Sequence, residues 1–105
     1  IKMDILRLFG EALEKKEYYK AHEILEEIWF PLRHTKTPEN LLQKGLINGA
    51  ISLEHGKRGN LKSAKVCYEN FNRYKSQIEH LSYDDKMLYL PVIEQLTILL
   101  QGENL

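Results

Sequence analysis

His22 and Glu26 are the two side chains whose types and spacing are best suited to chemistry. They stand four residues apart, and on a helix residues at that spacing lie on adjacent turns of one face. An imidazole nitrogen and a carboxylate oxygen in that arrangement can share a proton or bind the same cation. With Trp29, the pair spells His-x-x-x-Glu-x-x-Trp. The pattern predicts a site for a divalent metal ion on His22 and Glu26, with Trp29 as a wall of the adjoining ligand pocket.

A third metal ligand has to come from another segment, because protein metal sites normally use three or four side chains. His55 is the best candidate, since its predicted helix is expected to pack against the helix of His22. Asn48 lies on the same predicted face as His55, and Arg58 follows in the next turn, where its guanidinium can bind an anion. We therefore expect Trp29, Asn48, His55 and Arg58 to line a binding site for a small molecule of unknown identity.

Each of these residues also has a purely structural interpretation. His22 and Glu26 can hydrogen-bond to each other and help to fix the packing of the helix. His55 and Arg58 stand near the end of a predicted helix, where cationic side chains interact favourably with the helix dipole. The sequence leaves both interpretations open.

The composition argues against several classes of partner. Lys plus Arg and Asp plus Glu number 15 each among 105 residues, so no net charge favours binding to nucleic acid, an anionic membrane or an acidic partner. No stretch approaches the ~20 apolar residues that span a membrane. Cys67 is the only cysteine, which excludes an intramolecular disulfide and fits a reducing compartment. We expect a cytoplasmic protein without a nucleic-acid or membrane partner.

Apolar residues recur every three to four positions along the chain, which predicts an all-α fold. The expected helices span about residues 4–15, 17–30, 37–57 and 60–79, and a last helical region starts near residue 82. Pro91 is expected to interrupt or restart that last region, because a proline inside a helix removes a hydrogen bond. The prediction is a single domain over residues 1–105, folded as a compact bundle of about five helices.

Local signals mark helix ends and buried faces within this bundle. Thr37 and Asn60 are predicted N-caps, and Gly59 is expected to supply a left-handed turn. Gly45 and Gly49 are expected to let a neighbouring helix approach closely. The predicted core includes Tyr18, Leu25, Leu32, Leu42, Leu46, Leu53, Leu61 and Phe71. Residues 87–100 carry a surplus of apolar side chains, so we predict a homo-oligomer.

The His-x-x-x-Glu-x-x-Trp motif resembles the one that marks domain of unknown function family 309, a family of small bacterial and archaeal helical proteins. Residues 17–23 and 43–48, and His55 followed by Arg58-Gly59-Asn60, agree with this resemblance. It covers the chain from about Leu6 to Phe71. The resemblance implies a compact helical bundle whose motif binds metal, and it implies no known reaction.

Two functional hypotheses follow. The first is a helical domain that binds a metal ion or a small ligand through His22, Glu26 and Trp29. The alternative is a protein–protein interaction module without catalytic activity, because residues 18–26 and 59–69 resemble tetratricopeptide helices. Ala21 and Ala64, which would be equivalent positions, are spaced more widely than the ~34 residues of that repeat. The first hypothesis leaves open a hydrolase, in which Glu26 would be a metal ligand or a base. Neither hypothesis identifies a substrate.

Overall fold

The computed structural model describes residues 1–103, which form a bundle of α-helices without a strand. The five α-helices are α1 (Lys2–Glu14), α2 (Tyr18–Trp29), α3 (Pro38–Lys57), α4 (Leu61–Lys75) and α5 (Tyr83–Gln101), with two short 3-10 helices, η1 (Phe30–Leu32) and η2 (Ser76–His80). The all-α prediction is therefore confirmed. The last two residues of the predicted domain, 104 and 105, lie outside the described part.

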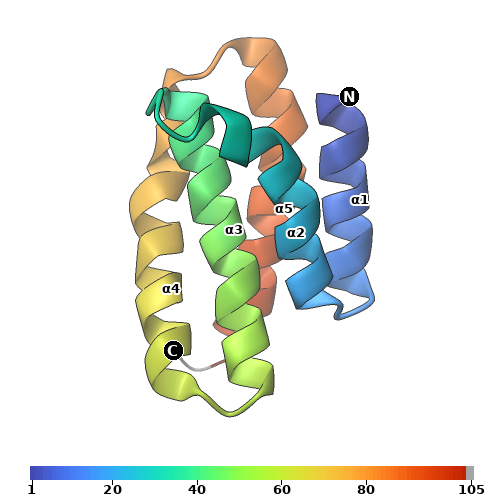
Figure 1. Cartoon of the computed structure of the whole chain (residues 1–105), viewed down its shortest axis with the longest axis vertical. Coiled ribbons are helices and arrows are strands. Elements are labelled where there is room, and N and C mark those ends of the chain that lie inside the picture. Colours follow the sequence, from blue (N-terminus) through green and yellow to red (C-terminus); the bar gives the residue numbers. More distant parts are fainter. Residues whose placement is uncertain (104–105) are drawn as a thin grey trace.

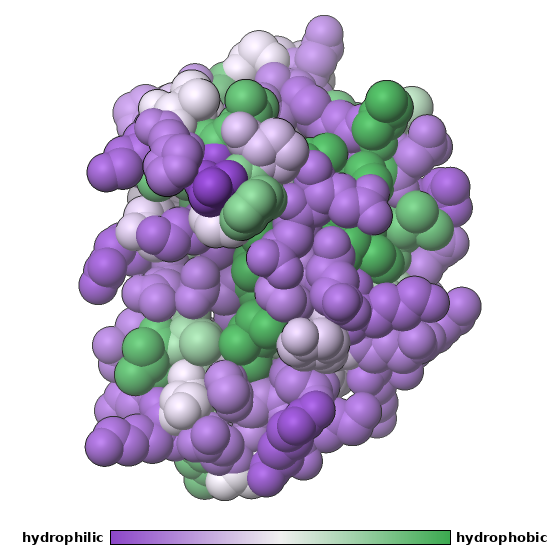
Figure 2. All heavy atoms as spheres, viewed as in Figure 1, coloured by the Kyte–Doolittle hydropathy of each residue, from purple (hydrophilic) through white to green (hydrophobic). Residues whose placement is uncertain are grey.

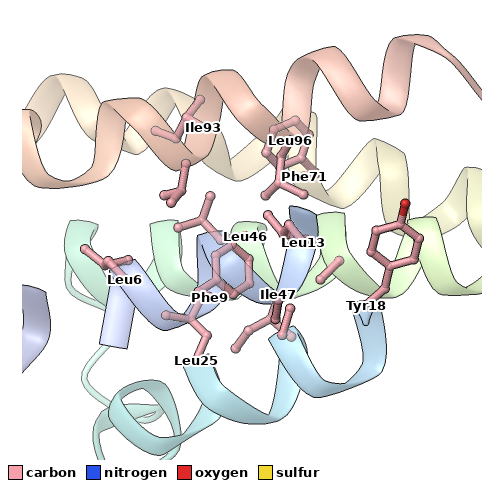
Figure 3. Close-up of a cluster of buried hydrophobic side chains, with 14 of the residues drawn as sticks. Leu6, Phe9, Leu13, Tyr18, Leu25, Leu46, Ile47, Phe71, Ile93 and Leu96 are labelled. Carbon is pink, nitrogen blue, oxygen red and sulfur yellow. The ribbon is translucent and has the colours of Figure 1, made fainter. Parts of the chain in front are cut away.

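Helix α3 is the centre of the arrangement. It packs against α2, α4 and α5, while α1 packs against α2 and α5 (Figure 1). The short η1 segment crosses over the start of α3 before the chain turns into that helix (Figure 1). Side chains from all five α-helices meet in one apolar cluster, which includes Phe9, Leu25, Leu46, Phe71 and Leu96 (Figure 3). Burying each such side chain stabilises the fold by about 1.5–3 kcal/mol.

Close contact between α3 and α4 depends on Gly45. A Cβ atom added there would lie 2.8 Å from the Cβ atom of Tyr74, which is closer than real side chains approach. At Gly49, an added Cβ atom would lie 3.1 Å from Leu96 and 3.2 Å from Phe71. The prediction that these glycines serve packing is confirmed.

The predicted helix starts are also observed. The Thr37 side chain accepts a hydrogen bond from the backbone N–H of Asn40 at 3.2 Å, and the Asn60 side chain accepts one from Ser63 at 3.4 Å. Gly59 has a φ of +78°, the left-handed conformation expected after a helix. These local signals fix where α3 and α4 begin.

The prediction that Pro91 interrupts the last helix is wrong, because α5 runs through it. A proline at this position leaves the carbonyl of Met87, one turn earlier, without its helical donor. Pro91 and Met87 are both exposed, so water can satisfy that carbonyl. The helix therefore tolerates the proline on its solvent side.

Two predicted core residues are exposed instead. Leu32 is 56% exposed, because the chain leaves the α-helical path at η1 and the periodicity of α2 no longer applies. Leu61 is 60% exposed, because it opens α4 beyond the last residue of α3, where no neighbouring helix covers it.

The face of the molecule that α2 and α3 share is largely polar (Figure 2). Figure 2 shows one face as mostly hydrophilic, with hydrophobic atoms in separate patches between polar side chains. Within residues 1–103, no helix combines the length and the apolar composition needed to cross a membrane.

Candidate functional site

His22 and Glu26 lie side by side on α2. The His22 Nε2 atom is 2.5 Å from Glu26 Oε1, and the two side chains are 16% and 36% exposed. The other ring nitrogen, Nδ1, lies 3.3 Å from the backbone carbonyl oxygen of Tyr19. The Tyr19 ring also contacts the imidazole, with the two ring centroids 5.1 Å apart. The pair predicted from the sequence is thus formed, and it is accessible to solvent.

The surroundings of the imidazole restrict its chemical state. If Nδ1 carries a hydrogen and donates it to the Tyr19 carbonyl, the lone pair of Nε2 faces the carboxylate of Glu26. Two acceptors facing each other repel, so this contact needs a positive group between or on them. A hydrogen on Nε2, donated to Glu26, satisfies it at the observed separation. A cation bound by both atoms would also satisfy it, with the two atoms about 3 Å apart, since zinc lies about 2.0–2.2 Å from each ligand. The arrangement is a hydrogen-bonded pair, and a small separation of the two side chains would make it a cation site.

A pocket adjoins this pair between α2 and α3. It has a cavity volume of about 210 Å³ and is lined by Tyr19, Ile51, Glu54, His55 and Arg58. The four residues from α3 follow the helical spacing of three and four, so they share one face. Tyr19 connects the two parts of the site, because it lines the pocket and contacts His22.

Glu54 and Arg58 form an ion pair in the lining of the pocket. The Arg58 Nε atom donates to Glu54 Oε2 at 2.6 Å, and these side chains are 70% and 14% exposed. The negative charge of Glu54 also reaches neighbouring α2. Burial, followed by the charges of Glu103 and Glu54, raises the pKa of Tyr18 above its ordinary range.

The expected third metal ligand is not brought into place. Helices α2 and α3 run antiparallel, so His55 near the end of α3 lies opposite Tyr19, one turn before His22. Within residues 1–103, no group of three or more His, Cys, Asp or Glu side chains is arranged to hold a metal ion. His55 therefore does not complete a set of three with His22 and Glu26.

Of the other predicted ligand-binding residues, His55 and Arg58 line the pocket, whereas Trp29 and Asn48 do not. Trp29 packs against the apolar core, and its carbonyl accepts a hydrogen bond from Asn40 at 3.0 Å. Asn48 accepts a hydrogen bond from Asn70 at 3.1 Å and so links α3 to α4. A role for Trp29 and Asn48 in ligand binding stays a prediction.

Sequence reasoning did not identify Tyr19 or Glu54. Glu54 and Arg58 are four residues apart, so their ion pair was detectable as a local pattern. Tyr19 stands three residues before His22, but its position over the pocket depends on how α2 packs against α3. Only the first of these signals is contained in the sequence.

The fold and these side chains define a small all-α bundle with a polar pair and an adjoining pocket on one face of α2 and α3. The family model described as "Domain of unknown function (DUF309)" matches residues 6–66, more than half of the chain. The chain belongs to this family, and the match includes every residue of the pair and the pocket. No curated protein and no solved structure matches the chain.

Proposed function

We propose that this protein binds a small ligand on the face formed by α2 and α3, with a divalent cation held by His22 Nε2 and Glu26 Oε1. The observation that carries this proposal is the convergence of these two atoms while Nδ1 is directed at the Tyr19 carbonyl. In metal sites, such a hydrogen bond to the second ring nitrogen fixes the tautomer and turns the free lone pair toward the ion.

The donor set fits a cation of intermediate character. An imidazole nitrogen and a carboxylate oxygen suit zinc, manganese or iron rather than calcium, which prefers oxygen alone. With two protein ligands, the remaining coordination positions are left to water or to a ligand in the neighbouring pocket. We expect weaker binding than at a closed structural zinc site. The proposal concerns binding, and no reaction is assigned.

The test is a calorimetric titration with zinc or manganese of protein purified without chelator and without metal-affinity chromatography, together with elemental analysis. We expect one equivalent to bind and the affinity to fall at least about tenfold in Glu26→Gln, as for loss of one ligand. Glu27→Gln is the matched control, because this exposed carboxylate lies on the same helix. Equal loss in both variants, or no binding by the unaltered protein, would refute the cation site.

A matching pair of histidine variants checks the second ligand. His22→Gln should lose cation binding, while His80→Gln should keep it, because His80 is exposed in η2. Unchanged binding in His22→Gln would locate the cation elsewhere on the protein.

A second candidate function, interaction with another copy of the chain, rests on a groove between α1 and α5. This groove has a volume of about 270 Å³, and its lining includes Met3, Leu6, Leu88, Pro91 and Val92. Its edge on α1 carries both charge signs, Arg7 and the acidic Glu11 and Glu14. A two-fold related copy would set opposite charges against each other around an apolar centre.

Light scattering at increasing concentration tests this second candidate. We expect a dimer that Met3→Lys dissociates, because Met3 is 65% exposed and lines this groove. Val66→Lys, which changes a 55% exposed residue on α4, should leave the dimer intact. A monomer at all concentrations would eliminate the candidate.

A further inference from the structure

The pocket beside His22 has an apolar wall and a polar edge. Tyr19 and Ile51 contribute an aromatic ring and a branched aliphatic chain, whereas His55 and Arg58 contribute hydrogen-bonding groups. The volume of about 210 Å³ lies below the range of pockets for drug-sized ligands, which begins at about 300 Å³. The dimensions therefore suit a small metabolite with an apolar body.

Arg58, at the edge of this pocket, has hydrogen-bond donors that are not used within the described residues. Its Nε atom is used by Glu54, and among the described residues its two terminal nitrogens have no acceptor. The terminal edge of a guanidinium presents two parallel N–H groups, a geometry that matches the two oxygens of a carboxylate. The pairing with Glu54 holds the base of the guanidinium in place without occupying that edge.

The net charge decides between classes of anion. Glu54 lines the pocket and already pairs with Arg58, so the one permanent cation of the lining is balanced by a carboxylate. A doubly charged phosphate would meet that carboxylate with no second permanent cation in the lining, so it is disfavoured relative to a singly charged anion. A singly charged carboxylate needs only the donors that Arg58 provides.

We infer that this pocket binds a small organic monocarboxylate, with the carboxylate on the terminal nitrogens of Arg58 and the apolar body against Tyr19 and Ile51. The inference deepens the proposed function by naming its ligand class, but it does not require the cation on His22 and Glu26. The two proposals can therefore fail separately.

The experiment titrates the full chain with benzoate, benzamide and inorganic phosphate in the presence of a chelator, followed by amide chemical shifts in NMR spectra. We expect saturable shifts with benzoate around Tyr19, Ile51 and His55, and binding at least about tenfold weaker for benzamide and phosphate. Equal affinity for benzamide would overturn carboxylate recognition. Tighter binding of phosphate, or no saturable binding of benzoate, would overturn the ligand class.

Variants at Arg58 supply the residue-level test. Arg58→Gln should weaken benzoate binding at least about tenfold, and Arg58→Lys should also weaken it because lysine lacks the planar fork. Arg73→Gln is the matched control, since Arg73 is an exposed arginine in the last turn of α4. If Arg58→Gln does not fold, Tyr19→Ala replaces it, because Tyr19 is 53% exposed and carries part of the apolar wall. Unchanged benzoate affinity in the Arg58 variants would overturn the inference.

The same titration separates this inference from the cation proposal. Glu26→Gln should retain benzoate binding in chelator even though it loses the proposed metal ligand. Loss of benzoate binding in Glu26→Gln would mean that the pair, rather than Arg58, determines recognition, and would overturn the inference as stated.

Discussion

The molecule contains two polar regions, and they differ in how far their polar groups are buried and paired. One is a buried network between α1, α3 and α5, centred on Tyr89. The Tyr89 hydroxyl donates to Glu39 Oε2 at 2.7 Å and accepts from Gln43 Nε2 at 2.9 Å. Lys2 Nζ lies 2.7 Å from Glu39 and 3.0 Å from Asp85, which continues the network to the surface.

The other region is the face of α2 and α3 that carries His22, Glu26 and the pocket. Within residues 1–103, no buried side-chain nitrogen or oxygen lacks a hydrogen-bond partner, so the buried Tyr89–Gln43 part of the first network is saturated. On the face of α2 and α3, by contrast, Arg58 and Glu26 are partly exposed and have capacity for another partner. A saturated network specifies packing, whereas spare donors and acceptors at the surface are available to a ligand.

The largest effect should come from removing the centre of the buried network. Tyr89→Ala deletes a fully buried ring and its hydroxyl, and should lower the free energy of unfolding by about 3–5 kcal/mol. Denaturant unfolding followed by circular dichroism measures this loss. The comparison predicts a much smaller loss for Arg58→Gln on the other face, and an equal loss would mean that both regions are structural.

Removing only the oxygen atom of Tyr89 distinguishes the contribution of the hydroxyl to stability from that of the ring. Tyr89→Phe keeps the packing but leaves Gln43 Nε2 without its acceptor, so it should cost about 1–3 kcal/mol at neutral pH. The measurement is again denaturant unfolding. A cost near zero would show that water or a neighbouring group replaces the hydroxyl.

The same variant should alter the response to alkali. Burial raises the pKa of Tyr89 above its ordinary range, and although the hydrogen bond from Gln43 opposes this, Glu39 reinforces it. Because the unfolded chain ionises near pH 10 while the folded chain does not, the contribution of Tyr89 is fully present below about pH 10 and is lost as pH rises toward the folded pKa.

Tyr89→Phe should therefore flatten the decline in stability above about pH 10. The flattening should be partial. Two other groups keep part of the decline. Burial lowers the pKa of Lys2, but hydrogen bonds and charges from Glu39 and Asp85 outweigh that effect and raise the pKa overall. Burial also raises the pKa of Cys67, and a group with a raised pKa loses its contribution to stability as pH rises. Thermal melts at a series of alkaline pH values test this, and an unchanged slope in Tyr89→Phe would contradict it.

The contrast between the two regions also explains how much was predictable from sequence. Helices and their caps depend on neighbours a few residues apart, and the Thr37 and Asn60 caps were predicted correctly. The His22–Glu26 pair was predictable for the same reason. The continuity of α5 through Pro91 was not predictable, because a helix tolerates a proline only where the freed carbonyl faces solvent, and the solvent-facing side of α5 depends on tertiary packing.

Contacts between segments far apart in the chain could not be predicted from local sequence spacing. Tyr89 bonds to Gln43 and Glu39, which are 46 and 50 residues away, and nothing in the local spacing pairs them. The proximity of Tyr19 to His55 likewise depends on the antiparallel packing of α2 and α3. The sequence therefore predicted the His22–Glu26 pair, which lies on one helix. It did not predict the pocket, which forms only where Tyr19 of α2 packs over α3.

The smallest predicted effect concerns the coupling between His22 and Glu26. A partly exposed polar pair at this spacing contributes about 0.3–0.5 kcal/mol, since solvent screens it and holding both side chains costs entropy. A double-mutant cycle with His22→Ala, Glu26→Ala and the double variant, measured by denaturant unfolding in chelator, isolates this term from the other effects of each substitution.

A coupling of that size would mean that the pair adds little to folding, as expected of residues kept for binding. A coupling above about 1.5 kcal/mol would instead favour the structural interpretation, in which the pair fixes the packing of α2. Repeating the cycle with saturating zinc sharpens the result. If both residues bind the cation, stability should rise with zinc only in the unaltered protein, by about 2.7 kcal/mol at one hundred times the dissociation constant. The coupling should then increase by nearly that amount, because either single substitution already removes the site.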